Sequence, residues 1–329
     1  MVYYYYKMKG INTMNKADFY LEHQIWNILD NGYLDKNPRP KYTDGTPAYT
    51  LSVNGNFREY DIGNGDFPIT TLRPIAWKSA IKEIFWIYQD QSNDLNLLND
   101  KYKVSYWNQW ESKDINGTIG IRYGAIVKEH NLMNKLLNEL TNDPYGRRHI
   151  IDLYQYADMD KSDGLYPCAF LTIWNVRQDM NTHEEYLDLT LIQRSGDLLA
   201  ASCSGVNEIQ YSALLMMVAR HCGYKTGKLF HYVANEQIYD RHKEQAKELR
   251  RRFDDPKRTT EEEYDDDENY YLGLYKPNSS HYVSYNDRRS NPKLILNPNK
   301  NNFYDFTIDD FTMINYNPIK PQLKFELGI

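Results

Sequence analysis

Apolar residues recur every three or four positions in several stretches, the spacing of a helix that buries one face. In residues 17–30, Leu21, Ile25 and Ile28 lie on one such stripe, and Gly32 follows where a helix ends. A second such stripe predicts a strongly apolar helix that ends near Tyr88. The same criteria predict helices over 75–88, 129–141, 207–222 and 236–252.

Short continuous apolar runs, rich in Ile, Leu and Val, predict strands. Residues 50–60 contain the turn-forming pair Asn54-Gly55 between polar and apolar alternation, which predicts a β-hairpin. The segment 302–316 closes the chain after the last predicted strand. Strands are expected over 149–154, 169–176, 187–194, 229–234 and 293–296.

Helices and strands alternate irregularly, which favours an α/β chain of the α+β type with a mixed sheet over a doubly wound one. The phosphate-binding patterns G-x-G-x-x-G and G-x-x-x-x-G-K-[ST] are absent. The length of 329 residues suits two average domains or one large domain with insertions. Residues 1–16 are polar and predict a flexible extension, and residues 254–291 a polar, acidic loop insertion.

The formal net charge of −6 is local. Nine acids and two bases lie in residues 254–268, and outside them 37 basic and 36 acidic residues remain. A nearly neutral body does not indicate a nucleic-acid-binding surface. The three cysteines form no C-x-x-C pair, the N-terminus lacks the apolar core of a signal peptide, and no apolar run approaches the length of a membrane span. A soluble, cytoplasmic protein is therefore expected.

Cys168 follows Pro167 directly before an apolar strand, where a side chain can face a cleft. A lone cysteine is more often a small buried hydrophobe than a nucleophile. The strand predicted at 187–194 ends in Arg194-Ser195, and a guanidinium near the thiol would lower its pKa and favour the thiolate. Arg194 and Ser195 together could also hold a phosphate.

Other candidates carry two interpretations each. Glu83 lies on the apolar face of its helix, where a carboxylate is either ion-paired or serves proton transfer with a raised pKa. Asn207 is either the N-cap of a helix or an amide that reads a pyrimidine edge. Arg147-Arg148 are either a solvated edge or an anion clamp. Trp107 stacks a flat heterocycle or belongs to the core. No His/Cys/Asp/Glu group has the spacing of a metal site.

Taken together, the sequence resembles the folate-dependent, flavin-independent thymidylate synthase family over about 17–253 and 293–329. The motifs stand in the family's order. They are DGTPAYTLSV (44–53), AWKSAIKEIFWIYQDQSND (76–94), YWNQW (106–110), DPYGRRHI (143–150), PCAF (167–170), QRSGD (193–197), NEIQY (207–211) and IYDRH (238–242).

The resemblance implies reductive methylation of dUMP to dTMP by 5,10-methylenetetrahydrofolate, with release of dihydrofolate and without metal or flavin. Cys168 would attack C6 of dUMP as a thiolate, Arg194 would activate it, and Glu83 would organise proton transfer. Tyr123 and Asp197 would complete the catalytic set. The implied dUMP-binding residues are Arg39, Arg147, Arg148, Gln193, Arg194, Ser195, Asp197, Asn207, Gln237 and Tyr239, and the implied folate-binding residues are Trp107, Asp197 and Ile329.

The family also implies one catalytic domain over 17–329 with a large mixed sheet flanked by helices. Two copies would pack through their sheets as a homodimer, and Arg147 and Arg148 would reach into the partner's site. The stretch 201–206 lacks the Pro-Phe pair usual before the uracil-reading Asn, and Gln237 stands where a His is usual. A dUMP or dCMP hydroxymethylase on the same fold therefore remains the alternative. A nucleotide- or RNA-binding regulator and an interaction protein that docks through 254–268 are further alternatives.

Overall fold

The computed structural model describes residues 15–254 and 291–329. The expected N-terminal extension and the acidic insertion therefore fall almost wholly outside the described residues. At the N-terminal border, Asn15 is buried and its side chain accepts a hydrogen bond from the Ala17 N–H, so the first helix begins at Lys16. An Asn at this position satisfies one of the backbone donors that every helix start leaves open.

A seven-stranded mixed sheet forms the centre of the described structure, in the order β1-β2-β7-β5-β4-β3 with β6 beside β7. Most neighbours are antiparallel, but β5 and β6 run parallel to β7. The expected mixed sheet is thus confirmed. The strands are β1 (Tyr33–Leu34), β2 (Thr50–Asp61), β3 (Ile150–Asp152), β4 (Ala169–Gln178), β5 (Glu185–Gln193), β6 (Gly196–Asp197) and β7 (Lys225–Tyr239), with β8 (Lys293–Leu296) and β9 (Phe311–Ile314) in a separate two-stranded ladder.

The hairpin predicted around Asn54-Gly55 is wrong. Both residues lie inside the single strand β2, which pairs with β7 from Thr50↔Tyr239 to Asp61↔Lys228. Gly55 has a φ of 78°, a value that suits a turn but that here only distorts the strand locally. Pairing along the whole of β7 outweighs the local turn preference of two residues.

The helix predicted to begin at 236 is also wrong at its start. Residues Glu236 to Tyr239 continue β7, because each pairs with a residue between Thr50 and Val53 of β2. The helix itself, α9, begins only at Lys243. Its amphipathic pattern was visible in the sequence, but the boundary was set by a strand almost two hundred residues away.

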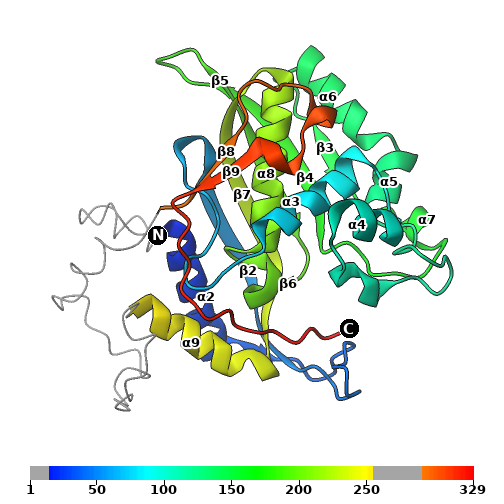
Figure 1. The fold of residues 1–329 in the computed structure, drawn as a ribbon, viewed down its shortest axis with the longest axis vertical. Helices are drawn as coiled ribbons and strands as arrows, with labels where there is room; N and C mark the ends of the chain where they lie inside the picture. The colour runs from blue at the N-terminus through cyan, green and yellow to red at the C-terminus, as the bar shows by residue number, and fades with distance from the viewer. Residues whose placement is uncertain (1–14, 255–290) are drawn as a thin grey trace.

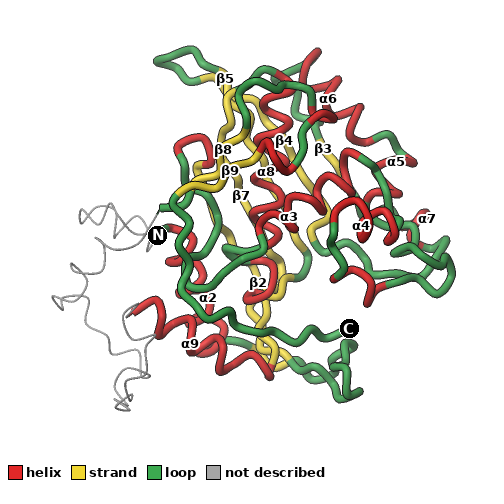
Figure 2. Tube along the Cα trace, in the orientation of Figure 1, coloured by secondary structure: helices red, strands yellow, loops and turns green. Residues whose placement is uncertain are grey.

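Helices cover one face of the sheet, as Figure 1 and Figure 2 show. The central one, α8, is buried on all sides between Ala213 and Ala219, which explains the longest apolar run in the sequence. The helices are α2 (Lys16–Asn31), α3 (Trp77–Ile84), α4 (Leu95–Tyr102), α5 (Gly124–Glu129), α6 (Leu132–Asn142), α7 (Tyr156–Met159), α8 (Val206–Cys222) and α9 (Lys243–Asp254), and the shorter helical turns are η1 (Ile62–Asn64), η2 (Phe85–Gln89), η3 (Tyr106–Trp110), η4 (Leu198–Ser202), η5 (Asp240–His242), η6 (Phe303–Asp305) and η7 (Ile308–Asp310).

The other face of the sheet exposes large apolar side chains. Phe57 on β2 is 59% exposed, and its cross-strand partner Tyr232 on β7 is 39% exposed. Phe57 also stacks on Phe230, and Ile150 continues the same face on the edge strand β3. A row of apolar residues of this size on a monomer surface marks an interaction site.

Packing around α8 predicts where the chain is most sensitive to truncation. Leu215 is fully buried in this helix, so Leu215→Ala removes apolar contacts and leaves a cavity. We expect the free energy of unfolding to fall by about 2–5 kcal/mol, measured by urea denaturation. The control is Met180→Ala, at a side chain that is 83% exposed, for which we expect a change within about 0.5 kcal/mol. Equal losses in the two variants would contradict the central role of α8.

Candidate active site

Four strand ends meet at one edge of the sheet. Cys168 stands directly before β4 and Arg194 directly after β5, and because these strands are antiparallel, Ala169 pairs with Gln193. The parallel pairing of β6 with β7 places Asp197 beside Gln237. Residues predicted from separate motifs are thus brought together by strand direction alone.

The Cys168 thiol lies against the guanidinium group of Arg194. The Arg194 Nη2 atom lies 3.6 Å from Cys168 Sγ. The same guanidinium donates hydrogen bonds to the carbonyl oxygens of Tyr166 (2.8 Å) and Pro167 (3.0 Å), and the Arg194 N–H donates to the Cys168 carbonyl. Arg194 therefore fixes the loop that carries the cysteine as well as facing its sulfur.

Burial raises the pKa of the Cys168 thiol, whereas the guanidinium groups of Arg194 and Arg39 lower it. Burial prevails, so the pKa lies above that of an ordinary thiol. Arg39 is itself exposed, and its charge lowers the pKa of Tyr239 at the end of β7 as well. The two cations are what keeps the thiolate within reach at neutral pH.

Tyr123 contacts Cys168 from the other side. Its hydroxyl accepts a hydrogen bond from the Cys168 N–H at 3.2 Å, and burial raises the pKa of this phenol well above its usual value. The Tyr123 backbone has φ 46° and ψ −107°, a strained combination for a residue with a side chain. Strain of this kind persists only where the surroundings enforce it, and it is concentrated at functional sites.

Glu83 projects from α3 into a buried position, with 6% of its surface exposed. Burial raises its pKa, although the hydroxyl of Tyr106 donates a hydrogen bond to the carboxylate and, with nearby Trp107 and Gln210, lowers it. Trp107 packs against Tyr123 with ring centroids 5.2 Å apart. No basic partner in the described residues pairs with Glu83, so the ion-pair interpretation is wrong and the proton-transfer interpretation is favoured.

Asn207 is not the N-cap of its helix, because α8 begins at Val206 after Gly205. The Asn207 side chain instead joins a polar row, in which its Oδ1 accepts from Gln193 Nε2 at 3.2 Å and its Nδ2 donates to Gln210 Oε1 at 3.1 Å. Ser195 Oγ donates to Gln237 Oε1 at 3.3 Å. Gln193 and Ser195 flank Arg194 in the sequence, and Gln193 pairs with Ala169, so these polar groups lie next to the Cys168–Arg194 pair.

Asp197 and the end of the chain border the same edge. Asp197 Oδ1 accepts hydrogen bonds from the backbone of Leu199 and Ala200. Its other oxygen, Oδ2, is buried without a hydrogen-bond partner among the described residues. Burial raises the pKa of Asp197, and the charges of His242 and Arg73 lower it.

The irregular C-terminal segment after β9 ends beside the loop that carries Arg39 (Figure 1). Ile329 exchanges two backbone hydrogen bonds with Lys41, of 2.8 and 2.9 Å. Gly328 packs so closely that an added Cβ would lie 2.8 Å from Ala48 and 2.9 Å from the Tyr239 ring. Only glycine permits this approach.

Arg147 and Arg148 are not brought to this cluster within one chain. Both are exposed in the connection between α6 and β3, at the opposite margin of the sheet from β2. The described contacts do not join either of them to Cys168. They are free to contact an anion or a second molecule.

Sequence reasoning missed several residues of the site. Tyr106, which contacts Glu83, lies inside the YWNQW motif, and Gln210 lies three positions after Asn207 and therefore on the same helix face. Glu208 was a visible signal too, since it is a carboxylate at the start of an almost wholly apolar helix. His242 and Arg73 carried no comparable local signal.

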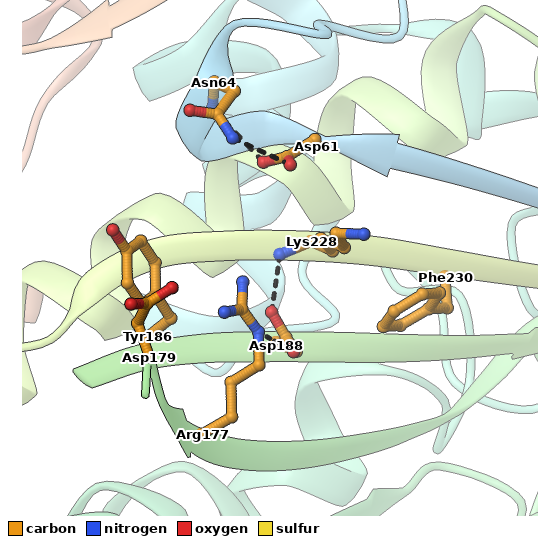
Figure 3. A pocket seen from close by; sticks show the side chains of 8 residues that line it. All are labelled: Asp61, Asn64, Arg177, Asp179, Tyr186, Asp188, Lys228 and Phe230. Atoms are coloured by element: carbon orange, nitrogen blue, oxygen red, sulfur yellow. Dashed lines mark hydrogen bonds and ion pairs between the residues drawn. The ribbon is translucent and has the colours of Figure 1, made fainter. Parts of the chain in front are cut away.

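A separate open pocket of about 480 Å³ lies at the other end of the sheet (Figure 3). Its lining cations are both paired: Arg177 Nε donates to Asp188, which also lines the pocket, at 2.8 Å, and the Lys228 ammonium pairs with Glu59, outside the lining, at 2.7 Å. Cys168 and the other predicted site residues do not line it, so this pocket is separate from the candidate site.

The described residues contain no group of three or more His, Cys, Asp or Glu residues arranged to hold a metal ion. None of their helices combines the length and apolar character that a membrane crossing requires.

A thiol that contacts a guanidinium group, with a buried carboxyl group and a row of amides near it, is an arrangement typical of enzymes that attack an anionic substrate covalently. The sequence model described as "Thymidylate synthase" matches residues 19–272. The thymidylate synthases of Streptococcus sanguinis and Streptococcus mutans are 47% and 48% identical to this chain over 317 residues, 96% of this chain and 100% of each relative. The structure of thermostable thymidylate synthase A from Bacillus subtilis superposes with a TM-score of 0.74 at 33% identity, covering 95% of this chain and 99% of that one.

The chain belongs to the thymidylate synthase family. The expected resemblance, the fold class and the methyltransferase class of enzyme are confirmed. The comparisons also support thymidylate synthesis over the hydroxymethylase alternative.

The electrostatics of Cys168 predict a pH dependence. Because its pKa lies above that of an ordinary thiol, alkylation by iodoacetamide should accelerate from pH 6 to beyond pH 8, about tenfold per pH unit while the thiol predominates. Arg39→Gln removes a cation and raises the pKa further, so alkylation at pH 7 should slow about two- to fivefold.

The experiment follows modification of Cys168 by peptide mass spectrometry in a Cys222→Ser background. Lys36→Gln, an exposed cation on the same loop, is the matched control and should leave the rate unchanged. A rate independent of pH, or equal effects of the two substitutions, would show that Arg39 does not act on the thiol.

Proposed function

We propose that the protein reductively methylates dUMP to dTMP with 5,10-methylenetetrahydrofolate as cosubstrate and releases dihydrofolate. The observation that carries the proposal is the contact of the Cys168 thiol with the Arg194 guanidinium at the sheet edge, in a chain of the thymidylate synthase family. No flavin or metal takes part in the proposed reaction, and we expect the enzyme to work in the cytoplasm.

Cys168 is the proposed nucleophile. Its thiolate forms a bond to C6 of the uracil, and the electron pair of the C5–C6 double bond moves towards C5 and O4, which makes C5 nucleophilic. Arg194 and Arg39 favour the thiolate before attack, since both lower the pKa of the thiol. The sulfur leaves again at the end of the reaction and restores the double bond.

The phosphate of dUMP is the proposed ligand of the cations at this edge. Arg194, Ser195 and Arg39 come from the same chain as the nucleophile, and guanidinium groups suit phosphate oxygens in number and geometry. Asn207, held by Gln193, reads the uracil edge. Gln237 and Tyr239 at the end of β7 contact the ribose.

Glu83 and Tyr123 are the proposed proton carriers. Burial raises the pKa of Glu83, so its protonated form is favoured more than in an exposed carboxyl group, and it can pass a proton to the substrate or to ordered water. The phenol of Tyr123 lies next to Cys168, so its oxygen is placed to accept, directly or through a water, the proton that C5 loses after it has bonded to the methylene carbon.

The folate cosubstrate supplies a one-carbon unit and then a hydride. Asp197 fits this ligand, because its Oδ2 is a buried acceptor without a partner among the described residues and can receive an N–H group of the pterin. Trp107 borders the ring from the side of Tyr123, and the Ile329 end closes the site through its hydrogen bonds to Lys41.

A homodimer completes the proposed site. The exposed apolar face formed by Phe57, Phe230, Tyr232 and Ile150 suits packing against a second copy of the sheet. Arg147 and Arg148 are exposed beside β3 and would then reach the phosphate in the partner's site. We also propose that each copy contributes a single catalytic domain, over residues 17–329.

The proposed reaction predicts which products form and how much turnover the Cys168→Ser variant loses. Incubation with dUMP and methylenetetrahydrofolate should yield dTMP and dihydrofolate, identified by mass spectrometry and absorbance. Cys168→Ser should lower turnover by at least about 10³-fold while dUMP still binds, because serine keeps the volume but lacks a reactive thiolate. Cys222→Ser is the control and should remain active. Hydroxymethyl-dUMP with tetrahydrofolate as products would instead indicate the hydroxymethylase.

Arginine donation across the dimer predicts complementation. Arg147→Ala/Arg148→Ala and Cys168→Ser should each be nearly inactive as homodimers. Mixed after reversible unfolding, they should regain about a quarter of wild-type activity, since half of the dimers are mixed and each has one intact site. Absence of any recovery, with mixed dimers confirmed by native mass spectrometry, would place the arginines in their own chain's site.

A further inference from the structure

A buried charged cluster lies directly behind the candidate active site. Arg58 of β2 donates from Nε to Glu208 of α8 at 2.6 Å and from both Nη atoms to Glu236 of β7 at 2.8 and 2.9 Å. His231 of β7 completes the cluster, with Nδ1 2.9 Å from Glu208 Oε1 and 3.3 Å from Arg58 Nη2. All four side chains are at most 3% exposed.

The cluster is connected to Asn207 by an unbroken row of hydrogen bonds. His231 Nε2 lies 3.1 Å from Gln193 Oε1. On its other side, Gln193 Nε2 donates to the Ser195 carbonyl at 2.9 Å and to Asn207 Oδ1 at 3.2 Å. Asn207 Nδ2 in turn donates to Gln210 Oε1.

In this row, the donor or acceptor role of each group determines the role of the group next to it. The carbonyl of Ser195 only accepts, so the amide nitrogen of Gln193 must face it, and Gln193 Oε1 must then face His231. His231 Nε2 therefore carries a hydrogen, and Nδ1 is the acceptor that faces Arg58 Nη2. With Gln193 fixed in this way, reversing the Asn207 amide would place its NH₂ group against the NH₂ group of Gln193. It would also place its oxygen against Oε1 of Gln210.

Glu208 holds Arg58 in place, and Arg58 in turn holds His231 by donating from Nη2 to Nδ1. Burial raises the pKa of Glu208, but Arg58 and His231 outweigh it and lower the pKa to about 2, so the carboxylate is charged. Its second oxygen accepts from the Tyr60 hydroxyl and the Ser204 N–H, at 3.0 and 2.6 Å. A carboxylate with this many hydrogen-bond partners is rigid, and so are the guanidinium group and the imidazole of the same cluster.

The fixed amide of Asn207 leaves one N–H and one oxygen lone pair for a ligand. Uracil presents an acceptor at O4 and a donor at N3, which match that pair. Cytosine presents a donor at the 4-amino group and an acceptor at N3, which match only the reversed amide. The direction of the Asn207 side chain is therefore a direct choice between the two bases.

We propose that His231, held by Glu208 and Arg58, is a positioning residue that locks Gln193 and Asn207 in the orientation that selects uracil over cytosine. This inference rests on the proposed function, in which Asn207 reads the base. It extends that function to a residue that does not touch the nucleotide, because base selectivity then depends on the hydrogen bond that His231 Nε2 donates to Gln193.

Two substitutions at His231 separate the donor from the bulk of the ring. Glutamine can place an N–H where Nε2 lies, and asparagine can place one only where Nδ1 lies. We expect His231→Gln to keep the ratio of the Kd values for dCMP and dUMP within about twofold of the wild type, and His231→Asn to lower that ratio about tenfold. Equilibrium dialysis with each nucleotide and the full chain measures the ratio.

Asn207→Asp is the positive control, because its carboxyl group can be protonated to favour cytosine. Equal ratios in His231→Gln and His231→Asn, whether both unchanged or both lowered, would overturn the proposal, since both substitutions remove the imidazole alike. A wild-type protein that does not bind dUMP or form dTMP would instead refute the proposed function and not this step.

Gln193→Glu tests the same lock if the His231 variants do not fold. The substitution keeps the acceptor for His231 but replaces the NH₂ group that faces Asn207 with an oxygen. Asn207 should then reverse, and the preference should shift towards dCMP by about tenfold or more. An unchanged preference in a folded Gln193→Glu protein, verified by circular dichroism, would overturn the proposal.

Discussion

The buried guanidinium of Arg58 is the constraint on which the other features of the structure depend. A charge without access to water must be surrounded by acceptors, and here they come from α8, from β7 and from the Ser202 carbonyl of η4. The ion pairs thus fix the start of the central helix against two strands of the sheet. Asn207 is the neighbour of Glu208, so the same contacts that satisfy Arg58 also set the position of the amide in the candidate site.

The candidate site balances burial against positive charge. Burial keeps the Cys168 thiol and the Glu83 and Asp197 carboxyls closer to neutral, while guanidinium groups favour the thiolate. Arg194 serves this balance without being held by a carboxylate, because the partners described for its guanidinium are two carbonyls and the sulfur. A cation with no fixed anionic partner remains able to bind the phosphate of a substrate. Site and scaffold therefore use arginine in opposite ways, since Arg58 is neutralised and Arg194 is not.

The sequence predicted the elements whose signals are local and missed those decided by distant pairing. The helix at 207–222 and the strands at 169–176 and 187–194 are present nearly as predicted, because their apolar runs are long and unambiguous. The hairpin at Asn54-Gly55 and the helix start at 236 were wrong for one shared reason: β2 and β7 pair along their full lengths. Within the site, ordered motifs identified Cys168, Arg194 and Asn207. The partners Tyr106 and His231 are defined by contacts between elements, which no local pattern encodes.

The pairing of β2 with β7 also has a consequence for synthesis on the ribosome. The two strands are adjacent in the sheet, yet Thr50 can pair with Tyr239 only after the ribosome has added β7. The pairing of β5 with β7 is delayed in the same way. Before the ribosome has added β7, the nascent chain exposes Phe57 and the unpaired edge of β2, which favours aggregation. The candidate site, built from both ends of this span, thus cannot assemble until most of the chain has emerged, and efficient production should benefit from slow translation or chaperones that shield the early strands.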